Sequence, residues 1–231
     1  MCGRPMVLRV LDALQQSGVI DQIVLCGPPQ AALKDCPELS ERIANENIIW
    51  VKNQDSPSKS VEAGLLQINK NVPVLVTTAD HALLTADIVQ EFLQGSIAAN
   101  VDATFALVSH ERISKAFPAV KRTVIKFREG GYCSCNLFTF MTESGRKLAP
   151  FWRSVEQKRK KPWKVVTGIL GVSAVVSYLF GTLTLKRVLQ RVSSRLEIGL
   201  DAVLLSSPRA GVDVDTPADR AFAEKVLAET L

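Results

Sequence analysis

The chain has 231 residues, of which 47% are hydrophobic and 22% are charged, and its formal net charge is +5. This length and hydrophobic content predict a single folded domain and exclude wholesale disorder. The positive charge permits anionic ligands, but no stripe of Lys and Arg with interleaved aromatic residues runs along the chain, so we expect no nucleic-acid partner.

The first half of the sequence alternates predicted helices and strands. A helix is predicted over residues 5–17, where apolar residues recur on one face. Short apolar runs predict four buried strands with helical segments between them, over 23–26, 48–51, 72–78 and 103–108. Strands that alternate with helices indicate an α/β fold with a mostly parallel sheet and helices on both faces.

The pattern changes after the fourth predicted strand. Polar and apolar residues alternate over 123–127, a turn is predicted at 128–131, and residues 136–140 are extended again. This pattern predicts either a hairpin-like excursion or strands that join the edge of the sheet. The sequence is then mostly helical in character until a last predicted strand over 202–205 and a final helix. We interpret the chain as one domain, 1–231, with a helical insertion over about 145–198.

An aspartate ends the third predicted strand. Asp80 follows the apolar run 72–78, which would place its carboxylate at the carboxyl edge of the sheet, where α/β enzymes bind ligands. Mg²⁺ prefers a few carboxylate oxygens together with phosphates and water. Asp80 is therefore a candidate metal ligand, and the alternative is a cap of the following turn. For the adjacent His81, the favoured role is that of a structural histidine with its hydrogen bonds satisfied, and the alternatives are a catalytic base or a metal ligand.

Two further aspartates alternate near the C-terminus. In an extended stretch, alternation puts Asp213 and Asp215 on the same face, and two like charges so close favour a metal or a nearby basic residue. Thr216-Pro217-Ala218-Asp219 has the pattern of a helix start, with a Thr N-cap, Pro at N1 and an acid at N3. We therefore expect Asp219 to cap the helix.

Two other segments carry polar groups that suit a ligand. Residues 56–60 offer hydroxyls, including that of Ser60, and one ammonium near a predicted helix N-terminus, where phosphate binds readily. Plain N-capping is the alternative there. Asn136, with the preceding glycines, is a candidate to line a ligand cleft, and simple turn chemistry is the alternative.

The five cysteines have no framework spacing, and Cys133-Ser134-Cys135 is too short for a C-x-x-C metal or redox pair. Free thiols suit a reducing compartment. No signal peptide pattern opens the sequence, so we expect a cytoplasmic protein.

One long uncharged segment challenges that interpretation. Residues 165–185 carry no charge and are long enough to span a bilayer, yet the segment contains several Ser, Thr and Gly residues. Buried or partner-covered helices are favoured, and contact with a membrane surface, as in a protein peripheral to the membrane, is the alternative. For the basic cluster 158–161, a solvated helix end is the favoured interpretation, and a contact with phosphate or acidic lipid is the alternative.

Taken together, and in this order, five segments resemble those of the MobA-like NTP transferases, a group similar to the molybdenum-cofactor guanylyl- and cytidylyltransferases. The matching segments are Gly3-Arg4-Pro5-Met6-Val7 with the following 9–14, Lys59-Ser60-Val61-Glu62-Ala63-Gly64-Leu65, Thr78-Ala79-Asp80-His81-Ala82-Leu83-Leu84, Asn136-Leu137-Phe138, and Asp213-Val214-Asp215-Thr216-Pro217-Ala218-Asp219. The resemblance covers nearly the whole chain. It departs from the family at Ala82, where Pro is usual.

The resemblance implies a three-layer, Rossmann-like fold of the GT-A nucleotide-diphospho-sugar transferase type. It also implies Mg²⁺-dependent transfer of a nucleotidyl group from an NTP to a small phosphorylated or hydroxyl acceptor, with release of pyrophosphate. By this resemblance Asp80 and Asp213 form the catalytic metal site and Asp215 is a further metal ligand. Arg4, Ser60 and Asn136 would contact the nucleotide. The base, the acceptor and the oligomeric state are not specified.

The family has a first strand and a Gly-rich basic loop before the position at which this sequence starts. Residues 1–5 correspond to a point just past that loop, so we expect weak or absent transferase activity from the chain as written. Two other hypotheses stand beside the transferase. One is a non-catalytic nucleotide-binding relative, and the other is a membrane-associated interaction protein built around 165–185.

Overall fold

A computed structural model gives the fold, and the structure describes residues 1–157, 177–178 and 180–229. Within these residues the strands follow the predicted order. They are β1 (Ile23–Gly27), β2 (Ile48–Lys52), β3 (Val74–Thr77), β4 (Ala103–Ser109), β5 (Ile125–Phe127), β6 (Gly130–Phe140) and β7 (Leu200–Leu204).

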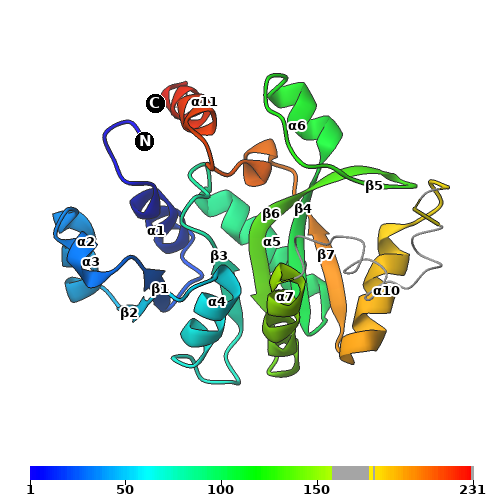
Figure 1. The fold of residues 1–231 in the computed structure, drawn as a ribbon, viewed down its shortest axis with the longest axis horizontal. Coiled ribbons are helices and arrows are strands. Elements are labelled where there is room, and N and C mark those ends of the chain that lie inside the picture. Colours follow the sequence, from blue (N-terminus) through cyan, green and yellow to red (C-terminus); the bar gives the residue numbers. More distant parts are fainter. Residues whose placement is uncertain (158–176, 179, 230–231) are drawn as a thin grey trace.

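Helices and short 3₁₀ turns connect the strands (Figure 1). They are α1 (Met6–Gln16), α2 (Gln30–Leu33), α3 (Pro37–Asn45), α4 (Pro57–Leu65), α5 (Ala86–Ala99), α6 (His110–Ala116), η1 (Ser144–Lys147), α7 (Leu148–Gln157), α10 (Leu185–Leu196), η2 (Pro208–Gly211) and α11 (Pro217–Ala228).

The described strands form two hydrogen-bonded groups. β1 and β2 pair in parallel, with Ile23 opposite Ile48. The larger group has the order β3–β6–β4–β7, and β5 pairs with β6 at the side. β6 runs antiparallel to both β3 and β4, while β4 and β7 are parallel. β3, β4 and β7 therefore point the same way, and the predicted α/β class with a mostly parallel sheet is confirmed.

Helices cover both faces of the larger sheet. On one face, apolar residues of α1 and α5, such as Leu14 and Phe92, pack against β4 and β6 in the main core. On the other face, α4 and α7 pack over β3, β4 and β6 around Phe140 and Ala149. A separate cluster joins α1 to α3 and the β1–β2 pair. Burial on both faces gives the three layers that the alternating sequence pattern predicts.

Side-chain caps begin five of the described helices, namely α4, α5, α6, α10 and α11. The hydroxyl of Thr85 accepts a hydrogen bond from the backbone amide of Ile88 at the start of α5. Thr216 and Asp219 form a reciprocal capping box at the start of α11, so the helix-cap prediction for Asp219 is confirmed. Ser56 is the N-cap of α4 and its hydroxyl accepts a hydrogen bond from the backbone amide of Lys59, so residues 56–60 form the start of this helix, which begins at Pro57.

The predicted insertion, 145–198, contains α7 and α10 among the described residues. Most of the uncharged segment 165–185 and all of the basic cluster 158–161 lie outside the described residues. In the described part of the chain, no helix combines the length and the hydropathy that crossing a bilayer requires.

Candidate active site

The two acidic segments, 133 positions apart from Asp80 to Asp213, meet at one end of the sheet. The backbone amide of Val214 donates a 3.1 Å hydrogen bond to the Asp80 carbonyl. The side-chain amide of Asn136 lies 3.3 Å from Asp80 Oδ1 and 3.4 Å from Asp213 Oδ2. Three polar side chains from distant parts of the sequence therefore converge at one point.

The sheet register explains why Asn136 lies there. Leu137 of β6 is opposite Thr77, the last residue of β3, so Asn136 lies next to the turn that carries Asp80. The Thr78 hydroxyl donates to Asp80 Oδ1 and holds this carboxylate from its own strand end. The sheet thus places an amide donor directly beside the strand-end aspartate.

A close helix contact fixes the approach of the second acidic segment. η2 leads into Asp213, and its last residue, Gly211, is buried against α6. A Cβ at Gly211 would lie 2.5 Å from Ile113 Cδ1, so a larger residue here would have to displace the Ile113 side chain. α6 therefore helps to define where the aspartate segment runs.

Arg122 forms an ion pair with Asp213 and belongs to the site, although sequence patterns do not identify it. Its guanidinium donates to Asp213 Oδ1, and the two side chains are only 15% and 20% exposed. The hydrogen bond to Asp213 is the largest cause that raises the pKa of Arg122. Burial alone would raise the pKa of Asp213, but the hydrogen bond and charge of Arg122 outweigh it, and that pKa is lowered.

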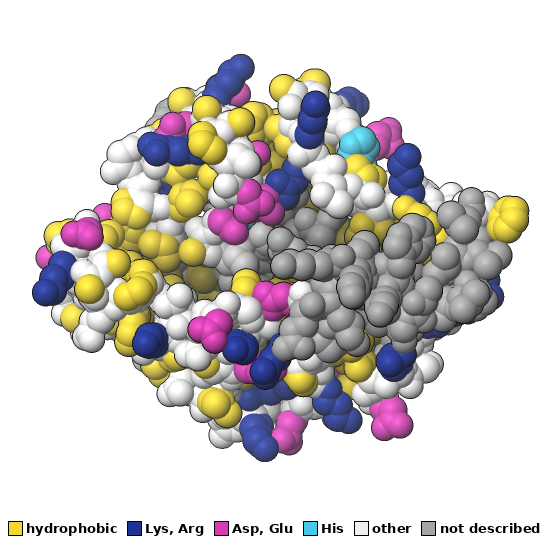
Figure 2. Space-filling model, viewed as in Figure 1, with side chains coloured by type: hydrophobic (Ala, Val, Ile, Leu, Met, Phe, Trp, Pro, Cys, Tyr) yellow, Lys and Arg dark blue, Asp and Glu magenta, His cyan; other side chains and the backbone are white. Residues whose placement is uncertain are grey.

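Asp215 lies at the exposed border of this cluster. Its pKa is raised, chiefly by the negative charge of Asp213, then by partial burial and by the charge of Asp80. The three carboxylates therefore lie close enough to repel one another, as the alternation of Asp213 and Asp215 predicts. Figure 2 shows a group of acidic side chains on this face below α11, with a basic side chain beside it.

His81 is buried directly behind the carboxylates, with 1% of its surface exposed. Burial is the main cause that lowers its pKa to about 4, so the ring is neutral at pH 7. The backbone of Ala210 opposes this shift slightly, yet within the described residues neither ring nitrogen has a partner in hydrogen-bond geometry. The expectation of a structural histidine agrees with this burial, but hydrogen-bond partners that would satisfy the two ring nitrogens are not found among the described residues.

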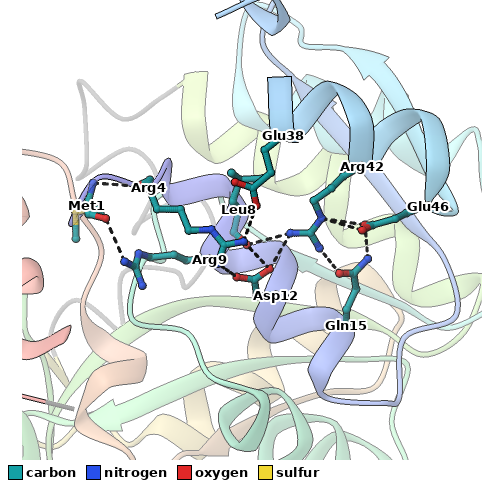
Figure 3. Close-up of polar contacts among 9 residues, drawn as sticks. All are labelled: Met1, Arg4, Leu8, Arg9, Asp12, Gln15, Glu38, Arg42 and Glu46. Carbon is teal, nitrogen blue, oxygen red and sulfur yellow. Dashed lines mark hydrogen bonds and ion pairs between the residues drawn. The ribbon is translucent and has the colours of Figure 1, made fainter. Parts of the chain in front are cut away.

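The structure places Arg4 and Ser60 in other contacts. Arg4 pairs with Asp12 and Glu38 at the start of α1 (Figure 3). The Ser60 hydroxyl accepts a 2.9 Å hydrogen bond from the backbone amide of Gln54. None of the hydrogen bonds or ion pairs found among the described residues joins either side chain to Asp80 or Asp213.

The chemistry of the convergent groups suits a hard divalent cation. Among the described residues there is no group of three or more His, Cys, Asp or Glu side chains arranged to hold a metal. Mg²⁺, however, is commonly bound by one or two carboxylates, with substrate phosphates and water completing its shell. Asp80 and Asp213 converge on one amide and provide these two carboxylates, so the residues present fit such an ion.

Carboxylates at one end of an α/β sheet that is covered by helices on both faces suit an enzyme that binds a phosphorylated ligand and a metal ion there. The structure is similar to a hypothetical transferase from Thermus thermophilus, with a TM-score of 0.75 and 28% identity over 94% of this chain and 86% of that chain. The fold also matches 4-diphosphocytidyl-2C-methyl-D-erythritol synthase from Anaerococcus prevotii, with a TM-score of 0.59 and 12% identity over 98% and 90% of the two chains.

A third structure of the same fold is CMP:2-keto-3-deoxy-manno-octonic acid synthetase complexed with CTP, with a TM-score of 0.59 and 12% identity over 99% and 90% of the two chains. These likenesses confirm the expected Rossmann-like fold. A comparison with curated protein sequences gave no match. The model of the MobA-like NTP transferase domain matches residues 1–158 of the 231. The chain belongs to the MobA-like NTP transferase family, and its enzyme class is nucleotidyltransferase.

Proposed function

We propose that this protein transfers a nucleotidyl group from an NTP to a small phosphorylated or hydroxyl acceptor and releases pyrophosphate, with Mg²⁺ as its cofactor. The observation that carries the proposal is the convergence of Asp80 and Asp213 on the amide of Asn136. Family membership supplies the reaction class, and the carboxylate pair supplies the place where a phosphate-bound cation would be held.

Each site residue has a role in this proposal. Asp80 and Asp213 hold the cation, and Asp215 is a further ligand at the exposed border. Asn136 orients the two carboxylates and borders the nucleotide. Bound there, Mg²⁺ would neutralise phosphate charge and orient the phosphates. The protein's own contribution is positioning, because bringing two substrates together in line removes much of the entropic barrier.

Arg4 and Ser60 are the proposed nucleotide contacts away from the carboxylates. Arg4 would have to exchange at least one of its two carboxylate partners for a phosphate, which the 37% exposure of its side chain permits. Ser60 stands in the first turn of α4, where the amides of a helix N-terminus favour an anion. The acceptor would then approach from the side of Asn136 and β6.

The first experiment measures Mg²⁺-dependent pyrophosphate release with each of the four NTPs and a panel of small phosphorylated and hydroxyl compounds. CTP is the first nucleotide to test, because one solved structure with this fold contains it. Asp80→Asn should abolish turnover without unfolding the protein, and Asp87→Asn, a substitution on the exposed side of α5, is the matched control. Full activity of Asp80→Asn would remove this residue from the metal site.

A non-catalytic nucleotide-binding role is the second candidate. It is favoured by the ion pairs that engage Arg4 and Asp213, since both groups are already neutralised by protein partners. Both roles predict NTP binding, so calorimetry alone does not separate them. Nucleotide binding without pyrophosphate release, over the whole acceptor panel, would favour the non-catalytic role.

A further inference from the structure

We infer that Arg122 is a positioning residue that holds Asp213 in the metal-free protein and gives up this carboxylate when a divalent cation binds. The inference rests on the proposed function, because it takes Asp80 and Asp213 as the cation's ligands. It adds a residue that neither the family segments nor the sequence patterns indicate. Arg122 lies in the connection 117–124 between α6 and β5.

The geometry shows that Asp213 is fully engaged without a metal. Its Oδ1 accepts from the Arg122 guanidinium, and its Oδ2 lies 3.4 Å from the Asn136 amide. A cation that binds Asp213 through Oδ1 therefore competes with a charged hydrogen bond, which is stronger than a hydrogen bond between neutral groups. The limited exposure of both side chains weakens the screening of this pair by solvent.

The charges around the site explain why Arg122 pairs with Asp213 in the metal-free protein. Asp80, Asp213 and Asp215 come from two acidic segments that meet at the hydrogen bond between the Val214 amide and the Asp80 carbonyl, so their negative charges lie close together and repel one another. In the metal-free protein Arg122 offsets part of this negative charge and allows the two acidic segments to stay together. Once a divalent cation is present, a guanidinium at the same carboxylate adds repulsion between two positive groups.

The position of Arg122 allows this exchange. Residues 118–124 belong to no helix or strand, so the side chain can turn away without breaking a ladder of backbone hydrogen bonds. Asp219 at the start of α11 is a second carboxylate whose charge reaches Arg122. A guanidinium released from Asp213 therefore keeps Asp219 as a negative neighbour. In the metal-free protein Arg122 pairs with Asp213, and in the metal-bound protein it would turn toward Asp219.

Mn²⁺ binding to the full chain, without nucleotide, tests the inference. Free Mn²⁺ is followed by electron paramagnetic resonance for the wild type, Arg122→Gln and Arg122→Lys. The Gln variant should bind Mn²⁺ on the order of 10-fold more tightly than the wild type, the scale on which groups beside metal ligands alter affinity. The Lys variant keeps the charge and should bind like the wild type. A merely structural role would weaken binding in the Gln variant.

Arg112→Gln is the matched control, because it removes the same charge from α6, where the Arg112 side chain contacts only the Ser206 carbonyl among the contacts described. It should leave Mn²⁺ affinity unchanged. A second measurement is thermal unfolding: Arg122→Gln should have a lower Tm than the wild type without metal and a larger rise in Tm with Mn²⁺. Arg122→Met, uncharged and similar in length, serves in the same way if the Gln variant does not fold.

Two results would overturn the inference, and they differ in whether the proposed metal site is kept or rejected with it. Unchanged or weaker Mn²⁺ binding in both uncharged variants, together with loss of binding in Asp213→Asn, would reject the exchange and keep the metal site. Mn²⁺ binding that is insensitive to Asp80→Asn and Asp213→Asn would show that these carboxylates are not the ligands. The proposed metal site would then fall together with the inference.

Discussion

The Asn136 side-chain amide and the Asp80 carboxylate lie 3.3 Å apart, although 56 positions separate them in the chain. The antiparallel pairing of β6 with β3 brings them together. Leu137 lies opposite Thr77, the last residue of β3, so the neighbouring Asn136 lies just beyond the end of that strand. The same amide lies 3.4 Å from Asp213. A strand that runs against its neighbours thus supplies the group that holds two carboxylates at one point.

Replacing Asn136 by Ala should weaken metal binding. The two carboxylates would lose their common donor and separate under their mutual repulsion, so we expect a loss of about 10-fold in Mn²⁺ affinity. Mn²⁺ titration measures it. Asn71→Ala, an exposed position whose amide contacts the turn at Asn69, should have no effect. Wild-type affinity in the Asn136 variant would show that the carboxylates are held by the backbone alone.

The strand-end aspartates could be predicted from the sequence because their signals are local. An apolar run that stops at Asp80 and a capping pattern behind Asp215 are each visible within ten residues. The capping box at Thr216 fixes the start of α11, and with it the direction of the acidic segment. Local patterns therefore predicted the acidic residues of the candidate site, and the structure shows that the two acidic segments meet.

The rest of the site depends on pairings that local patterns do not specify. Arg122 stands in a connection without periodicity, and its ion-pair partner Asp213 is 91 positions away in the sequence. Likewise, sequence patterns do not show that the ring nitrogens of His81 lack hydrogen-bond partners among the described residues. Arg4 could be read as a phosphate contact because Asp12 and Glu38, which compete for it, lie 8 and 34 positions away. The roles of the candidate residues therefore stay predictions.

Removal of the Thr216 hydroxyl should destabilise the protein through α11. The Asp219 amide donates a 3.2 Å hydrogen bond to this hydroxyl, and the Thr216 amide donates to Asp219 at 2.9 Å. Loss of such a cap costs about 1 kcal/mol in the free energy of unfolding. Urea denaturation of Thr216→Ala measures it, and Thr216→Ser, which keeps the hydroxyl, should stay near the wild type. Equal stability of the three proteins would contradict the cap.

Arg42 and Arg4 share Asp12 as a partner but should differ in their effect on stability (Figure 3). Arg42 is 10% exposed and reaches Asp12 at 2.8 Å and Glu46 at 2.9 Å, which ties α3 to α1. Arg42→Gln removes the cation that pairs with Glu46 and one of the two cations that pair with Asp12, and because the Arg42 side chain is nearly buried this should cost about 3 kcal/mol. Arg4 is 37% exposed, so Arg4→Gln should cost less than about 1 kcal/mol.

Urea unfolding of the two arginine variants gives both values in one assay. Arg4→Gln is also informative for function, because a residue that contacts phosphate should lower NTP affinity when replaced while stability changes little. NTP affinity equal to that of the wild type would restrict Arg4 to its ion pairs. A larger loss of stability for Arg4→Gln than for Arg42→Gln would reverse the assignment made from burial.

Alkaline pH should destabilise the fold through Cys135. This thiol is buried in β6, and burial is the main cause that raises its pKa from 9.0 to about 12. Between pH 9 and pH 12 the unfolded chain has released this proton while the folded chain keeps it. The folded state then binds more protons, so stability falls as pH rises, by about 1.4 kcal/mol per pH unit for one such group.

The contribution of Cys135 is isolated by comparing the wild type with Cys135→Ala in urea at pH 8 and pH 10. The variant loses packing at both values, but its further loss between them should be smaller by about 1.4 kcal/mol. Burial also raises the pKa of Cys26 and Cys133, so part of the slope persists in the variant. Cys2→Ala changes an exposed thiol and should keep the wild-type slope. Parallel pH profiles for the wild type and Cys135→Ala would mean that this thiol ionises as readily in the folded chain as in the unfolded one.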